Sequence, residues 1–132
     1  MSELLKMVGE TTSDDLFVDL YPLARVEGRI IRAQESTPLE IKRGTIMALS
    51  SADGKLVPLG TTANSSNSET LTPDCVLCDD ITVATSDINV AVYASGCFNA
   101  NRVITVNNHV ITAAEKDTLR KYDIILKAAS KI

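Results

Sequence analysis

Three cysteines and one histidine are the residues whose chemistry could support catalysis or metal binding. Cys75 and Cys78 form a Cys-x-x-Cys motif, and Cys97 and His109 could in principle complete a four-ligand zinc site. The motif lies in a strand-like context, where residues three apart point to opposite faces. A thioredoxin-type motif also requires its first cysteine at a helix N-terminus within a βαβ unit, which this sequence does not offer. The pattern therefore favours buried thiols over a metal or redox site, and it predicts no cofactor.

The other polar residues suggest no catalytic set. His109 has no evident serine or cysteine nucleophile with a partner carboxylate around it. Asp79, Asp80 and Asp87 are locally acidic, but a hard cation needs several oxygens from a shaped loop, and no EF-hand spacing is present. Neither a glycine-rich phosphate loop nor a nucleophile elbow occurs. We expect a protein that is not an enzyme and that acts through its surfaces.

Composition predicts one domain with a modest core. Of 132 residues, 45% are hydrophobic but only 4% are aromatic, so the core must consist mainly of Val, Ile, Leu and Ala. A domain of this size is only modestly stable alone, and self-association would help it. The odd number of cysteines fits a reducing compartment. Residues 4–8 are too few for a signal peptide, and no segment approaches the length of a membrane span.

The net charge of −4 belongs to the N-terminus. Residues 1–24 hold five acidic side chains and one lysine, whereas residues 25–132 hold 12 basic and 12 acidic side chains. A neutral domain lacks the cationic face that binds phosphates, so nucleic acid is not an expected partner. The acidic segment is either a solvated tail or an arm that meets a basic surface.

Apolar periodicity predicts an N-terminal arm over residues 1–24 and a β-rich domain over residues 25–132. Residues 61–72 are polar and of low complexity, which predicts an exposed loop. Thr112 and Glu115 have the spacing of a capping box, so a helix should run from there to about Lys121. The expected strands are residues 25–31, 46–49, 55–59, 75–78, 88–94, 103–106, 109–111 and 122–128, with a tight turn at Asn107-Asn108.

Four stretches in this order carry a family resemblance: residues 41–58, 73–80, 90–99 and 114–127. Over about residues 26–126 the chain resembles lambda-type bacteriophage head decoration proteins. The resemblance implies a mainly β, barrel-like (β-tulip) fold with one short C-terminal helix and an extended N-terminal arm. It also implies a homotrimer that binds the major capsid protein on the outside of the virion. The sites would be three-fold and quasi-three-fold positions of the expanded head, which this cement protein would strengthen against internal DNA pressure.

Residues 16–31 offer a physical route to this role. The segment is mostly apolar and β-prone, and a small monomer could not easily bury it. We expect it to add as a strand to an exposed edge of the capsid protein, with three arms per trimer acting together. The expected contacts of this capsid-binding arm are Phe17, Leu20, Tyr21, Leu23, Val26 and Ile30.

Two alternatives stay open. The first is a small cysteine-dependent metal-binding or redox protein built on Cys75, Cys78, Cys97 and His109. The second is a β-barrel module that recognises carbohydrate, although the shortage of aromatic residues weighs against a sugar-stacking surface. No membrane partner is expected.

Overall fold

The structure is a computed structural model, and it describes residues 15–64, 66 and 68–128. The fold is mainly β: 44% of the described residues have strand conformation, and one short helix among them lies near the C-terminus, as predicted. The elements are β1 (Phe17–Asp19), β2 (Arg25–Ile31), β3 (Leu39–Ile41), β4 (Ile46–Ser50), β5 (Leu56–Pro58), β6 (Leu71–Leu77), β7 (Ile81–Val83), β8 (Ile88–Asn99), α2 (Ala113–Arg120) and β9 (Ile124–Lys127).

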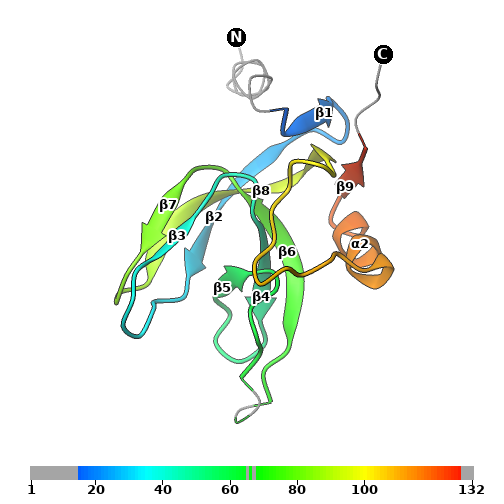
Figure 1. The fold of residues 1–132 in the computed structure, drawn as a ribbon. Coiled ribbons are helices and arrows are strands. Elements are labelled where there is room, and N and C mark those ends of the chain that lie inside the picture. The colour runs from blue at the N-terminus through cyan, green and yellow to red at the C-terminus, as the bar shows by residue number, and fades with distance from the viewer. Residues whose placement is uncertain (1–14, 65, 67, 129–132) are drawn as a thin grey trace.

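Five strands close into a barrel, in the order β8, β2, β5, β4, β6 and back to β8. All neighbours are antiparallel except β2 and β5, which are parallel and share the single register pair Ile31↔Leu56. The far end of β8 continues beyond the barrel, where β1 and β9 flank it. β1 and β9 therefore lie at one end of the molecule, and the β5–β6 connection reaches the other (Figure 1). β3 and β7 form a separate two-stranded ribbon.

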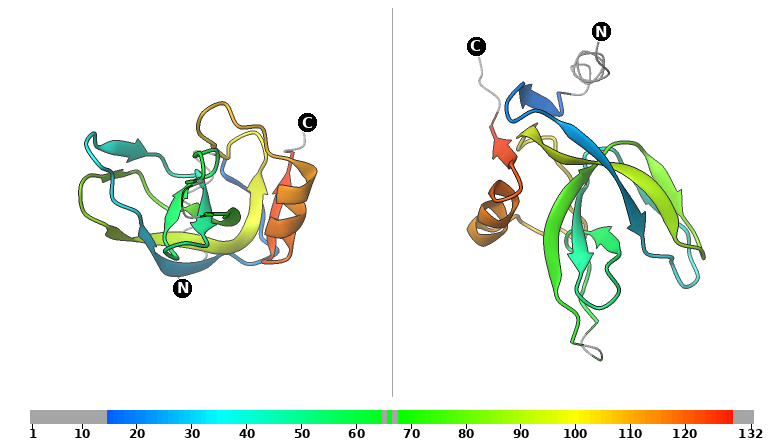
Figure 2. Two further views of the ribbon diagram at one scale, coloured as in Figure 1. Left: turned by 90° about the horizontal axis from the view of Figure 1, so that it is seen from below. Right: turned by 180° about the vertical axis from the view of Figure 1, so that it is seen from behind.

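Two apolar clusters occupy the two faces of the barrel wall. The first contains Met47 and a residue from each of the other barrel strands, so it fills the barrel. The second takes the alternate side chains of β4, Ile46 and Ala48, and is covered by Leu119 of α2 and Ile124 of β9. Because strand side chains alternate, β4 is buried on both faces and has an almost continuous apolar sequence. α2 and β2 lie on different sides of the barrel (Figure 2).

Several local predictions are confirmed. The expected strands 46–49 and 55–59 are present as β4 and β5, which pair with each other, and the capping box forms at Thr112 and Glu115. Asn107 and Asn108 both have positive φ, as a tight turn of this kind requires.

Two predictions are wrong in detail. Residues 103–106 and 109–111 are not strands, because they form no continuous ladder: Ile104 makes only an isolated parallel bridge with Thr45, in which Ile104 N–H donates to Gly44 O and Ile46 N–H donates to Ile104 O. The polar stretch 61–72 is not wholly exposed, because Glu69 is buried and β6 begins at Leu71.

Residues 1–14 of the expected arm lie outside the described residues. The part that is described is built into the domain, contrary to the expectation of a segment without partners in the monomer. Leu16 is 2% exposed and belongs to the second core cluster. Phe17 pairs with Phe98 across β1 and β8, and β2 pairs along its whole length with β8.

Candidate binding surface

The cysteines are separated by the barrel wall and form no site. Cys75 belongs to the cluster inside the barrel and Cys78 to the cluster outside, as expected for strand residues three apart. All three thiols are free and buried. Burial raises the pKa of Cys75, and it raises that of Cys78 to about 12, so neither thiol ionises at neutral pH. Within the described residues, no group of three or more His, Cys, Asp or Glu side chains could hold a metal ion.

His109 has a carboxylate partner that the sequence analysis missed. Its Nε2 lies 2.7 Å from Oε1 of Glu115, which also accepts from Thr112 N–H at 2.9 Å. Burial alone would raise the pKa of Glu115, but these hydrogen bonds outweigh it and the pKa lies below its ordinary value. The pair stabilises the start of α2. The six-residue spacing and the capping box were the only sequence features that could have suggested it.

The apolar side chains on one face of β2 point to solvent, which is the reverse of the usual distribution of side chains on a strand. Val26 and Ile30 are 45% and 44% exposed, whereas Glu27 and Arg29 on the other face are only partly exposed. Gly28, between the two apolar residues, has open space where a Cβ would lie. The alternation predicted from the sequence is present, but its apolar face points to solvent. An exposed apolar strand face is stabilised when another surface covers it.

The backbone of β2 has one free edge. Arg32 N–H donates to Leu56 O at 3.0 Å, so the backbone groups of even-numbered residues point toward the β5 side. Since β5 meets β2 only at Ile31↔Leu56, no strand among the described residues pairs with this edge at Val26 or Gly28.

A second hydrogen bond shows independently that the backbone groups of even-numbered β2 residues point away from β8. Gly28 lies opposite Ala91, whose carbonyl accepts from Cys78 on the far side of β8. Ala91 and Gly28 therefore do not bond to each other, and Gly28 must point away from β8. Arg29 Nη1 donates to Gly28 O at 3.0 Å, so a side chain already contacts this edge. A charged side chain is a common protection for an unpaired strand edge.

The other residues expected in the capsid-binding arm divide into two groups. Leu20, Tyr21 and Leu23 are exposed, Tyr21 most of all at 71%. Phe17 instead packs in the domain, with its ring 5.0 Å from that of Tyr93 and 4.8 Å from that of Phe98. We refer to these three exposed residues together with Val26 and Ile30 as the β2 surface.

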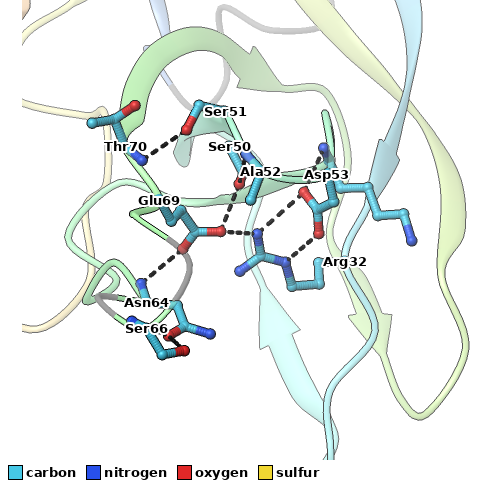
Figure 3. Close-up of polar contacts among 10 residues, drawn as sticks. Arg32, Ser50, Ser51, Ala52, Asp53, Asn64, Ser66, Glu69 and Thr70 are labelled. Carbon is cyan, nitrogen blue, oxygen red and sulfur yellow. Dashed lines mark hydrogen bonds and ion pairs between the residues drawn. The ribbon is translucent and has the colours of Figure 1, made fainter.

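A network of hydrogen-bonded polar side chains lies at the end of β2, and no sequence pattern indicated it (Figure 3). The Arg32 guanidinium donates to both oxygens of Asp53, at 2.9 and 3.2 Å, and to Oε2 of Glu69. Glu69 also accepts from Ser50 Oγ at 2.5 Å and from Asn64 N–H at 3.0 Å. The Arg32 hydrogen bonds hold the pKa of Asp53 and of Glu69 at about 2. The network joins three segments, and among the described residues it contains no cluster that could hold a metal ion.

No protein-family model matches the chain, and no curated protein sequence matches it. Among the described residues, no helix is long and apolar enough to cross a membrane.

Proposed function

We propose that this chain is a capsid decoration protein of the lambda type, which binds the outer surface of the expanded phage head and strengthens it. The proposal is supported by the resemblance in element order and carried by one structural observation. β2 turns Val26 and Ile30 toward solvent beside an unpaired backbone edge. We propose the major capsid protein as the partner that covers this face, and the virion as the location; nucleic acid and membrane have no part in it.

Strand addition is the mechanism we propose for the contact. An extended segment of the shell would pair with the backbone edge at Val26 and Gly28, where it would displace Arg29 Nη1 from Gly28 O, and Val26 and Ile30 would fill pockets beside it. Leu20, Tyr21 and Leu23 would extend the contact along the preceding segment. Three copies in a homotrimer would present three such contacts, so that each could be weak while the trimer holds firmly.

The test is cosedimentation with empty expanded heads of the phage that encodes this chain, prepared without it. Val26→Lys and Ile30→Lys each place a charge in the β2 surface, and we expect affinity to fall about tenfold or more. Val110→Lys is the matched control, because Val110 is 80% exposed and lies outside this surface. The proposed function is wrong if the wild-type chain does not bind the heads, and the proposed contact is wrong if all three variants bind alike.

A truncation separates the N-terminal arm from the β2 surface. Residues 1–14 are the segment to remove, because removal up to residue 24 would also take Leu16 and Phe17 from the core. We expect weaker binding to heads with no loss of folding, measured by the same cosedimentation. Unchanged binding would exclude a contribution from the arm and leave the β2 surface as the contact.

The metal-binding or redox alternative has less support. Its three thiols are buried and lie in different parts of the core, with raised pKa values. A chain that chelates zinc through them would have to rearrange both faces of β6.

A further inference from the structure

The weakest junction of the barrel is the seam between β2 and β5. β2 pairs with β8 from Arg25 to Ile31, and β4 pairs with β6 from Ile46 to Ser50. The seam has the single register pair Ile31↔Leu56. Because each ladder bond contributes only modestly to stability, a one-pair seam is not held by its ladder alone.

Arg32 directly follows this pair, and its hydrogen bonds connect three chain segments at the seam. Its amide donates to Leu56 O at 3.0 Å, one of the hydrogen bonds that define the Ile31↔Leu56 pair. Its guanidinium bonds Asp53 in the β4–β5 turn and Glu69 in the segment before β6. The Glu69 side chain is only 1% exposed, so this ion pair is poorly screened by solvent.

A second ion pair brings in the fourth segment at this end of the barrel. Lys55 Nζ lies 2.5 Å from Oδ2 of Asp87 in the β7–β8 connection. The other oxygen of Asp87 accepts from Ala33 N–H at 2.7 Å, just beyond the end of β2. Lys55 immediately precedes β5, so this pair also joins the two strands of the seam. Charged groups from four connections therefore converge where the ladder is shortest.

We propose that Arg32, Asp53, Lys55, Glu69 and Asp87 form a conformational latch that closes the barrel at the β2–β5 seam. When the latch is broken, the seam opens locally and the edges of both strands become free. The rest of the barrel stays folded, because β4, β6 and β8 are joined by longer ladders and by both apolar clusters. This device is independent of the proposed function.

Amide hydrogen exchange measured by NMR on the full chain tests the latch. Glu69→Gln keeps the side-chain shape but removes the charge that faces Arg32. We expect the Arg32 amide to exchange about ten to a hundred times faster, the range for loss of a hydrogen bond to a charged group. The Leu77 amide, which donates to Thr45 O at 2.9 Å, reports opening of the β4–β6 side and should change much less.

Two further variants keep the test decisive. Asp53→Asn lies in an exposed turn and should fold even if the Glu69 variant does not, with the same selective acceleration at Arg32. Glu27→Gln is the control: it removes a carboxylate that pairs with Arg25 and Arg29 on the same strand but away from the seam. The latch is refuted if Arg32 exchange is unchanged, rises only in step with Leu77, or rises equally in the control.

Discussion

At the scale of single residues, two glycines differ in what the fold requires of them. Gly60 has φ +109°, and a Cβ there would lie 2.1 Å from Val106 O. Gly28 has no atom within 4 Å of the same position. We expect Gly60→Ala to lower the free energy of unfolding by about 3 kcal/mol, through backbone strain and overpacking. Gly28→Ala should leave it unchanged or raise it by about 0.5 kcal/mol, because glycine is unfavourable within a strand.

Urea denaturation of both variants measures the difference. Equal losses at the two positions would contradict the prediction, since only one glycine is enclosed. A stable Gly28→Ala variant would also be a suitable protein for the head-binding experiment, because any change in binding would then come from the β2 surface.

The burial of Phe17 is an example of a property of a single residue that could not be predicted from the sequence. Its position in an apolar, proline-containing segment suggested a residue awaiting a partner. The rings that cover it belong to Tyr93 and Phe98, more than 70 positions further along the chain. A contact between such distant residues leaves no periodicity in the sequence, so only the three-dimensional fold could distinguish Phe17 from its exposed neighbour Tyr21.

At the scale of elements, α2 depends on its first turn. Thr112 Oγ1 accepts from Glu115 N–H at 3.1 Å, and the Glu115 carboxylate accepts from Thr112 N–H. We expect Thr112→Ala to reduce the free energy of unfolding by about 1 kcal/mol, the usual value of such a cap. Thr118→Ala makes the same chemical change within the helix, where Thr118 Oγ1 only donates to Ala114 O. It should be neutral or stabilising, because alanine is the better helix former. Thermal unfolding followed by circular dichroism would reveal equal shifts if the cap had no role.

The elements predicted correctly are those with a local cause. The β4–β5 hairpin and the start of α2 are encoded by alternation, a turn and a capping box within about fifteen residues. Residues 103–106 are as aliphatic as a strand but form only an isolated bridge at Ile104 and separate bonds such as Val106 N–H to Leu59 O, without a continuous ladder. Strand propensity describes a side chain that fits a half-buried surface, and it does not specify a ladder partner.

At the scale of the whole molecule, the family resemblance implied a barrel-like fold, but the order of the strands that close the barrel could not be predicted from the residues. β2 and β5 are adjacent only because the intervening ribbon strand β3 and strand β4 are placed elsewhere. Their parallel pairing and the polar network depend on that arrangement. Glu69 stands in a run of small polar residues typical of an exposed loop, and only its distance to Arg32 shows that it is structural. The β2 surface is likewise a consequence of topology, because the same alternation would serve a strand with its apolar face inward.

The whole molecule should lose stability in acid through this network. Hydrogen bonds from Arg32 lower the pKa of Asp53 from 3.8 to about 2, and those from Arg32 and Ser50 lower that of Glu69 from 4.5 to about 2. A carboxyl whose pKa is lowered on folding binds protons more readily in the unfolded chain, so its contribution is complete above the unfolded pKa. We therefore expect the urea midpoint to be constant above about pH 5 and to fall as the pH drops from about 4.5 toward 2. Glu69→Gln should be less stable at pH 7 but show a shallower fall, because one of the carboxyls whose pKa is lowered on folding is gone. A parallel fall in both proteins would mean that Glu69 does not contribute to the pH dependence, and that other carboxyls with lowered pKa values, such as Asp87, account for it.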